Sequence, residues 1–379
     1  MTVNTPEWEA AGLYDPDAPE AEDRLALLEY LTARGASLEQ MVEAHRLGAL
    51  PGLASGLVTR VDAPLVPVKE IAERSGVAEP RVLRALLAAG IPATADSEIA
   101  ADLVHLVAAF EQGSALFGEE AVLAFTRVMG AAAISIAEAA VALFYAELGP
   151  GSEREGANEL ERAQVSEAAG RAFTTVPGIV SRMVEDQFER AQRRALVQRG
   201  WEEGAAGADE TAPRAAQDML VALGFVDLVG STAWAQRLNL REQNLALARF
   251  ESAAWSSAVL AGGRVIKTIG DEVFFAAPSA DAACRIGITI CRAAHEDRIL
   301  PPARGIVGFG FATPREGDYY GPLVVRLARM VKVGEPGQLV VTDAAAAQLS
   351  ADQWSLHALE LDELRGVEGP VKAFVAEPV

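Results

Sequence analysis

The sequence contains few of the residues that build disulfide frameworks or metal-binding clusters. Only two of its 379 residues are cysteines, Cys284 and Cys291, which lie seven positions apart in one helical pattern. A disulfide scaffold is therefore excluded, and we expect two small apolar packing residues in a reducing cytoplasm. The four histidines, which lack the spacing of metal ligands, are His45, His105, His295 and His357.

Positive charge is also scarce. The chain has 33 Lys and Arg against 53 Asp and Glu, a formal net charge of −20, which argues against a surface built mainly to bind nucleic acid. The first nine residues lack a basic segment followed by an apolar core, so we expect no secretory signal and a cytoplasmic location. Half of the residues are apolar, and the length suffices for two domains with a substantial core.

One apolar run, Val122 to Leu148, is long enough to cross a membrane. Arg127, Glu138 and Glu147 interrupt it, and a charge near the centre of a span costs about 2.5 to 3.5 kcal/mol. Its alanines and Gly130 suit close helix packing. We therefore expect a buried or dimer-interface helix and no stable membrane span. A small apolar ligand enclosed near this run is a further hypothesis, and a well-filled helical core is the alternative.

The N-terminal half has helical periodicity and almost no alternating strand pattern. Leucines at helical spacing predict a helix over residues 23–34, and Ser37 with Gln40 is a capping-box signature for the next one. Another helix is predicted over residues 163–199. The expected divisions of the chain are an all-helical regulatory and dimerisation domain (1–199), a linker rich in Gly, Ala and acids (200–216), and a second domain (217–379).

Residues 68–87 resemble the helix-turn-helix of DNA-binding proteins, with one helix ending at Ser75 and a second beginning near Glu79. Arg81 and Arg84 lie on the second helix, but DNA affinity generally depends on many phosphate contacts, and two arginines make few. The favoured interpretation is a corner between helices inside a larger helical domain, without a nucleic-acid partner.

The second half begins with a predicted strand, Met219 to Asp227, that ends on an acid. Gly230, Ser231 and Thr232 then lead into a helical composition over residues 233–253. In such a joint the acid can bind a cation, and the turn amides and the positive end of the helix can bind a polyphosphate. The alternative is a plain strand–helix joint with Ser231 or Thr232 as the N-cap.

A β-hairpin is predicted one helix later. β-Branched and aromatic residues over 264–275 flank a turn at Gly270 and Asp271, so Asp271 is displayed at the tip. Lys267 lies on the first strand of the hairpin and is expected to point into the same cleft.

The order of these elements predicts a ferredoxin-like sheet. Strand, helix, hairpin, helix (279–296) and strand (305–312) make a βαββαβ pattern, in which the end of the first strand lies beside the hairpin. Asp227 and Asp271 can then share two divalent cations, as phosphoryl-transfer sites require.

Four motifs in order resemble the successive signatures of class III adenylyl cyclases, over roughly residues 217–377. They are Phe225–Thr232, Gly263–Phe274, Gly317–Pro322 and Glu335–Thr342, and the similarity ends with Gly366–Val371. The N-terminal half further resembles the regulatory domain of actinobacterial pH-responsive cyclases. The resemblance implies an α + α/β chain, an all-helical domain followed by a ferredoxin-like cyclase domain, and a homodimer with its active sites at the interface between catalytic domains.

The resemblance also implies roles for individual residues. Asp227 and Asp271 would hold two Mg²⁺ or Mn²⁺ ions. Lys267 and Asp318 would read adenine, the lysine donating to N1 and the carboxylate accepting from the exocyclic amine, so that ATP is favoured over GTP. Arg329 would stabilise negative charge on the α-phosphate in the transition state. The substrate-binding turn is expected at Gly230, Ser231 and Thr232.

The chain departs from the family pattern at two positions. Val325 stands where the family has the asparagine that orients the ribose, and Gly308 stands at a position that is commonly histidine. A valine side chain cannot form that hydrogen bond, so roughly 10² to 10³ in rate is expected to be lost. Gly308 is expected to have modest functional weight, and Arg326, next to Val325, is a candidate to reach the phosphates instead.

Two functions from different classes follow. The favoured one is an adenylyl cyclase that converts ATP to cyclic AMP and pyrophosphate and is regulated by its N-terminal domain. The alternative is an impaired homologue that serves as a nucleotide-binding or regulatory protein, with Val325 as its main support. A transcription factor is the weakest option. His45 and His105 are candidates for a pH response, although a structural role is favoured for both.

Overall fold

The computed structural model describes most of the chain in two compact units, Met1–Asp186 and Gln187–Val379. The described residues are 5–60, 63–148, 157–204, 218–359 and 372–379. The expected linker falls mostly outside them, as does the motif Gly366–Val371.

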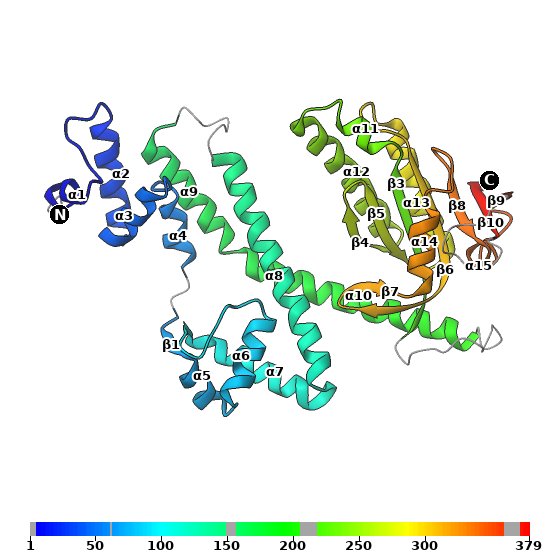
Figure 1. Cartoon of the computed structure of the whole chain (residues 1–379), viewed down its shortest axis with the longest axis horizontal. Coiled ribbons are helices and arrows are strands. Elements are labelled where there is room, and N and C mark those ends of the chain that lie inside the picture. The colour runs from blue at the N-terminus through cyan, green and yellow to red at the C-terminus, as the bar shows by residue number, and fades with distance from the viewer. Residues whose placement is uncertain (1–4, 61–62, 149–156, 205–217, 360–371) are drawn as a thin grey trace. The chain divides into compact units, whose positions relative to one another are not determined.

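Helices make up most of the first unit (Figure 1). They are α1 (Thr5–Ala10), α2 (Ala21–Ala33), α3 (Leu38–Arg46), α4 (Leu53–Thr59), α5 (Val68–Ser75), α6 (Glu79–Ala88), α7 (Val104–Phe117), α8 (Glu119–Leu148), α9 (Glu159–Phe173) and the first part of α10 (Val176–Gly204), with one 3₁₀ turn at Ala101–Leu103. The Ser37 hydroxyl oxygen accepts a hydrogen bond from the Gln40 backbone amide, and the Gln40 side-chain oxygen accepts one from the Ser37 backbone amide, which confirms the predicted capping box.

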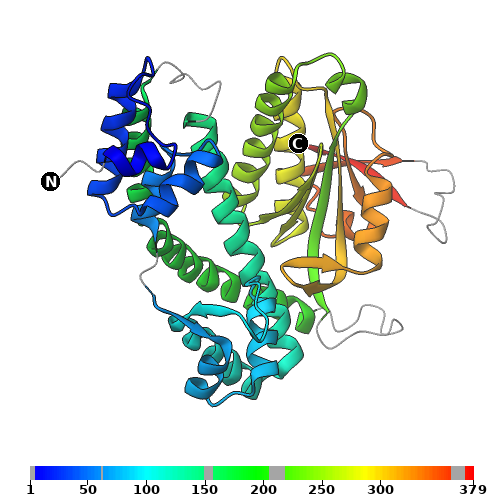
Figure 2. The same cartoon turned by 60° about the vertical axis from the view of Figure 1, so that its left-hand side comes forward.

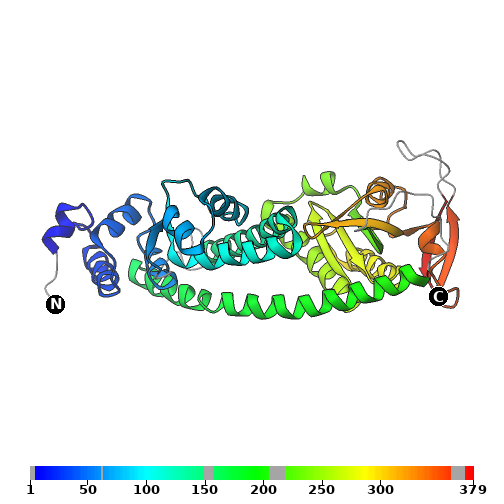
Figure 3. The ribbon, with the colours of Figure 1, turned by 90° about the horizontal axis from the view of Figure 1, so that it is seen from below.

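The expectation of one helix over residues 163–199 is wrong, because α9 and α10 are separated at Thr174 and Thr175. The two hydroxyls donate to the carbonyls of Arg171 and Ala172. Such local side-chain bonds compete with continuation of a helix. Beyond this break, α10 is one continuous helix (Figure 3).

The expectation of an all-helical N-terminal half is wrong at one place. β1 (Leu65–Pro67) pairs with β2 (Glu98–Ala100) in an antiparallel two-stranded sheet. Each strand has only three residues, too few for an alternating pattern to be recognised.

The helix-turn-helix segment corresponds to α5 and α6. Gly76 ends α5 in the left-handed conformation, with φ of 69°. Arg81 donates to Glu111 at 2.9 Å and to Glu119 at 2.6 Å, and Arg84 also pairs with Glu119. Because carboxylates already neutralise both arginines, the structure favours the corner over a DNA-reading helix.

Helix α8 is not the buried helix expected from its composition. The described part, Glu119–Phe144, is long and apolar enough to cross a membrane, yet only 6% of an apolar 18-residue stretch within it is buried. Its first turns pack through Val122 and Leu123. Large apolar side chains further along α8 are exposed, namely Phe125, Met129, Ile134, Ile136, Val141 and Leu143. The dimer-interface interpretation stays a prediction.

The second unit combines helices with a mixed sheet. Its strands are β3 (Met219–Leu228), β4 (Arg264–Ile269), β5 (Glu272–Ala277), β6 (Ala303–Arg315), β7 (Asp318–Tyr320), β8 (Leu339–Thr342), β9 (Trp354–Leu359) and β10 (Ala373–Pro378). Its helices, besides the end of α10, are α11 (Ser231–Ala235), α12 (Leu240–Leu260), α13 (Ala280–Glu296), α14 (Pro322–Met330) and α15 (Asp343–Ala346).

The strand order is β4-β5-β3-β6-β8-β10-β9, with β7 paired to β6. From β3 to β6 the chain follows the expected βαββαβ order, with antiparallel neighbours, whereas β6 and β8 are parallel. The helix expected over residues 233–253 is instead α11 and α12, because Asn239 and Glu242 form a capping box that starts α12.

The sheet carries α12 and α13 on one face and α14 on the other (Figure 2). Alternate residues of β3 follow this division: Ala222 and Val226 pack with the α12–α13 core, and Leu223 and Phe225 pack with the α14 core. By the same alternation Asp227 lies on the α14 face. The two free cysteines are buried in α13, as expected.

Candidate active site

The two predicted metal aspartates come together at one end of the sheet. Asp227 is 8% exposed near the end of β3, and Asp271 lies in the turn between β4 and β5. The Leu228 amide donates to the Asp271 carbonyl at 3.2 Å, which ties the hairpin turn to the end of β3. Gly270 supplies the left-handed residue that the turn needs, with φ of 65°.

The electrostatics of this end of the sheet favour a bound cation. Burial raises the pKa of the Asp227 carboxyl, and the neighbouring Asp271 raises it further, against a hydrogen bond from Arg304. Burial also raises the pKa of Glu272, which lies opposite Asp227 in the β3–β5 register, and Asp227 adds to that effect. The acids are therefore incompletely compensated by the protein itself.

The donor set fits Mg²⁺ or Mn²⁺, since carboxylate oxygens are the ligands that these hard cations prefer. Within the described residues, no group of three or more His, Cys, Asp or Glu side chains is arranged to hold a metal. Asp227 and Asp271 would thus supply two carboxylates, and the remaining ligands would come from water, backbone carbonyls and substrate phosphates, as is usual for Mg²⁺.

The turn that follows β3 differs from one detail of the prediction. Gly230, with φ of 70°, is the N-cap of α11, and it makes no side-chain cap hydrogen bond. Ser231 and Thr232 are the first residues of the helix, so the alternative interpretation, in which one of them is the N-cap, is wrong in that detail. A left-handed N-cap suits glycine because it has no Cβ. The substrate-binding role of the three residues stays a prediction.

Lys267 and Asp318, 51 positions apart, are in direct contact. The Lys267 Nζ donates to Asp318 Oδ2 at 2.5 Å, and Asp318 Oδ1 accepts from the Tyr319 amide at 2.7 Å. The pair is accessible, with 46% of the lysine side chain and 18% of the aspartate side chain exposed. One donor and one acceptor thus lie side by side, the pattern that the N1 and amino group of adenine require.

Two features of the backbone, a bulge and a tight turn, position this pair. The β4–β5 register shifts between Val265 and Lys267, and a bulge of this kind redirects the side chains that follow it. β6 and β7 form a hairpin in which Arg315 pairs with Asp318. Its two turn residues, Glu316 and Gly317, both have positive φ, 52° and 81°, as a type I′ turn requires.

Val325, one of the two departures from the family pattern, lies on helix α14. Val325 is 49% exposed, and Arg329 is exposed one turn later on the same side of the helix. Arg326 does not extend in that direction, since its Nη2 lies 3.8 Å from Asp343 Oδ1. The structure therefore does not support Arg326 as a phosphate ligand.

Gly308 has a packing role that the sequence did not reveal. It lies on β6 under α14, and a Cβ at this position would be 2.7 Å from Leu327 Cδ2 and 3.1 Å from Leu323 Cδ1. At Gly310 the nearest atom, Leu323 Cδ2, would be 3.6 Å away, which is an ordinary contact. Gly308 therefore allows α14 to lie close to the sheet.

Sequence reasoning gave no role to two basic residues near Asp227, Arg304 and Lys332. Arg304 Nη2 lies 3.3 Å from Asp227 Oδ2, and the charge of Lys332 lowers the pKa of both Asp227 and Glu272. The missed signal is the β3–β6 register, which sets Arg304 opposite Asp227.

No protein-family model matches the chain. An adenylate cyclase of Glutamicibacter nicotianae is 37% identical over 147 residues, which are 38% of this chain and 36% of that protein. An uncharacterized protein of Mycobacterium tuberculosis is 28% identical over 97% of this chain and 92% of its own length. A pH-sensitive adenylate cyclase of Mycobacterium tuberculosis is 26% identical over 93% of this chain and 87% of its own length. The chain thus spans about a third of the first relative and most of the other two.

Solved cyclase structures also match part of the chain. The adenylyl cyclase CyaB of P. aeruginosa aligns with 42% of this chain and 95% of its own, at 18% identity and a TM-score of 0.38. A Trypanosoma brucei adenylate cyclase aligns with 44% of this chain and 90% of its own, at 24% identity and a TM-score of 0.38.

The sequence relatives with a named activity are adenylate cyclases, which confirms the predicted resemblance to class III adenylyl cyclases. The similarity to the pH-sensitive enzyme extends over both units.

Proposed function

We propose that the protein is an adenylyl cyclase that converts ATP to 3′,5′-cyclic AMP and pyrophosphate. The observation that carries the proposal is the Lys267–Asp318 contact, which offers adenine a donor and an acceptor from two strands of the sheet that also holds Asp227 and Asp271. At the ring nitrogen N1 and the neighbouring exocyclic group, guanine presents the opposite donor and acceptor pattern to adenine, so a site with this pair discriminates against GTP.

In the reaction, the ribose 3′-oxygen forms a bond to the α-phosphorus and loses its proton, the bond from that phosphorus to the bridging oxygen breaks, and pyrophosphate leaves. Two divalent cations, when bound, would activate the hydroxyl and neutralise the triphosphate. Asp227 and Asp271 would hold those cations, Lys267 and Asp318 fix the base, and the backbone at Gly230 to Thr232 faces the phosphates. Arg329 stabilises charge on the α-phosphate.

The test is production of cyclic AMP by the purified full-length protein with ATP and Mn²⁺, with an Asp271→Ala variant as the control for background. Cyclic AMP no higher than in that control refutes the proposal. Saturable ATP binding without turnover would instead support the second candidate, an impaired homologue, which Val325 favours.

The active sites form between two copies of the chain, with the metal aspartates of one facing the base-reading pair of the other. The exposed apolar side chains of α8 suit a surface covered by a second copy. Mixing the Asp271→Ala variant, which should be inactive, with the Lys267→Ala variant, which should be impaired at low ATP concentration, then restores part of the activity at low ATP, because one of the two sites in a mixed dimer has both residues intact. Activity that stays absent after subunit exchange contradicts the shared site.

The first unit regulates the second, in a cytoplasmic enzyme. Its support is the similarity of both units to the pH-sensitive relative. Cyclase rates of the full chain and of a truncated chain starting near residue 210 should diverge as pH changes, and equal rates at every pH refute regulation. Recovery of the full-length protein in the membrane pellet after cell lysis refutes the cytoplasmic location, because α8 is apolar enough to cross a membrane.

A further inference from the structure

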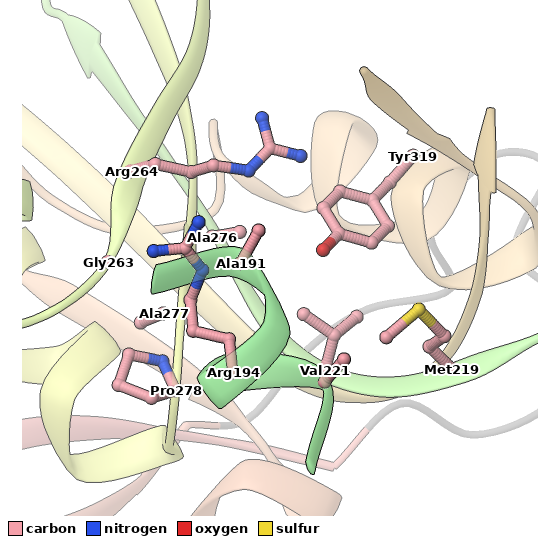
Figure 4. Close-up of a pocket in the computed structure, with 11 residues that line it drawn as sticks. Ala191, Arg194, Met219, Val221, Gly263, Arg264, Ala276, Ala277, Pro278 and Tyr319 are labelled. Atoms are coloured by element: carbon pink, nitrogen blue, oxygen red, sulfur yellow. The ribbon is translucent and has the colours of Figure 1, made fainter. Parts of the chain in front are cut away.

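A pocket of about 190 Å³ lies in the second unit, toward the start of β3 and so away from Asp227 at the other end of that strand (Figure 4). Five elements contribute to its wall: the second half of α10, β3, β4, the end of β5 and β7. The lining residues are Ala191, Arg194, Ala195, Met219, Val221, Gly263, Arg264, Ala276, Ala277, Pro278 and Tyr319. None of these described residues carries a carboxylate.

Two guanidinium groups and a phenol surround this space. Figure 4 shows the side chains of Arg194, Arg264 and Tyr319 arranged around it. Arg264 is held from the protein side, because its Nη1 donates to the Gly317 carbonyl at 3.0 Å and its guanidinium carbon lies 5.3 Å from the centre of the Tyr319 ring. Its remaining N–H groups are available to a ligand.

The like charges of the two arginines are uncompensated within the pocket. Burial holds the pKa of Arg194 below its usual value, and the charge of Arg264 lowers it further, with a smaller contribution from Arg190. An anion placed between the two groups would reverse that repulsion. Arginine is well suited to this task, since its planar fork binds carboxylate or phosphate oxygens through two parallel hydrogen bonds.

We propose that this pocket is a binding site for a small oxyanion, a phosphate or a short carboxylic acid, held between Arg194 of α10 and Arg264 of β4. The volume limits the ligand: one water occupies about 30 Å³ of liquid, and typical pockets for larger ligands measure about 300 to 1,000 Å³. A whole nucleotide is therefore too large. Met219, Val221 and Pro278 give one side of the pocket an apolar wall, which a short carbon chain would contact.

The bound anion would connect α10 to the strands of the base-reading pair. Arg264 precedes Lys267 by three residues on β4, and Tyr319 follows Asp318 on β7. The proposal concerns binding alone and does not depend on the cyclase activity proposed above, so its test uses no turnover.

Isothermal titration calorimetry on the full-length protein tests the site, with sodium phosphate in one arm and sodium acetate in the other, at constant ionic strength. The expected result is saturable binding in at least one arm, and the arm that binds identifies the oxyanion. Arg194→Met should weaken this binding about tenfold or more, because charge-assisted hydrogen bonds are lost. Arg194→Lys, which keeps the charge but loses the fork, should weaken it less.

Arg193→Met is the matched control, since Arg193 immediately precedes Arg194 in α10, has 76% of its side chain exposed and pairs with Glu189. It should leave the affinity unchanged. Arg264→Met gives a second test from a different element, and thermal unfolding without anion checks that each variant folds. Absence of saturable binding in both arms overturns the proposal, and so does an affinity that Arg194→Met and Arg264→Met leave intact.

Discussion

Replacing Val325 by asparagine should raise the cyclase rate. Val325 lies on the exposed side of α14, one turn before Arg329, and 49% of it is exposed, so the new amide would be accessible to a nucleotide bound next to Arg329. The valine side chain can neither donate nor accept a hydrogen bond, whereas the asparagine side chain can do both.

The expected gain is roughly 10² to 10³ in kcat, about 2.7 to 4 kcal/mol, which is the usual effect of one positioned donor at a reacting centre. Stability should change little, within about 0.5 kcal/mol, because the side chain is half-exposed and no packing contact is deleted from the core. The gain should appear in kcat more than in KM, since the hydrogen bond orients the ribose for attack.

The assay is initial-rate formation of cyclic AMP from ATP with Mn²⁺ by the purified full-length Val325→Asn variant. Val325→Ala is the control, because it removes the branched side chain without adding an amide, and its kcat should stay near that of the unaltered protein. A rate that Val325→Asn leaves unchanged, in a variant that folds normally and binds ATP, refutes the reasoning that the valine limits catalysis.

Three further outcomes are expected. Lys267→Met should raise the KM for ATP and reduce the preference for ATP over GTP, as measured by kcat/KM for each; an unchanged preference contradicts the base-reading role. Hydrogen bonds from Tyr30 and from arginines lower the pKa of the buried Glu167 from 4.5 to about 2, so its charged form contributes stability above pH 4.5 that is lost as pH falls toward 2. Glu167→Gln should therefore cost about 3 kcal/mol at pH 7, and the difference in Tm should shrink below pH 4.5; a constant difference contradicts this. Gly308→Ala should lower the free energy of unfolding by about 1 to 3 kcal/mol, whereas Gly310→Ala should not; equal effects contradict the packing role.

The parts of the fold that the sequence predicts are those set by neighbouring residues. The Gly270–Asp271 turn follows from a glycine between two β-branched runs, and the Ser37 cap follows from one hydroxyl three residues before Gln40. The expected βαββαβ order follows from local composition and turn residues, because each element is long enough for its residue types to distinguish strand from helix.

The parts that it does not predict depend on register and on distant partners. The Arg304–Asp227 ion pair exists because β3 and β6 are antiparallel with those two residues opposite, and no local pattern encodes that pairing. Helix α8 has the composition of a buried helix, but the composition of one helix does not determine how many other elements pack against it. β1 and β2 are too short for any period to be seen.

The two departures from the family pattern are physically connected, which leads to a last prediction. Gly308 lies under α14 and Val325 lies on it, so the glycine sets how close to the sheet the helix carries residue 325. Leu327 occupies the space that a Cβ at Gly308 would need, at 2.7 Å. A change at Gly308 must therefore shift the helix or the leucine, and a shift of the helix would move Val325 with it.

A double-mutant cycle tests this connection. Because residues that share a backbone shift couple by about 0.5 to 3 kcal/mol, Gly308→Ala should reduce the rate gain of Val325→Asn by about threefold or more. Gly310→Ala, on the same strand but in ordinary contact with α14, should leave the gain intact. Additive effects of Gly308→Ala and Val325→Asn on kcat would show that the position of α14 does not control residue 325, and the two departures would then be independent changes in one helix–strand contact.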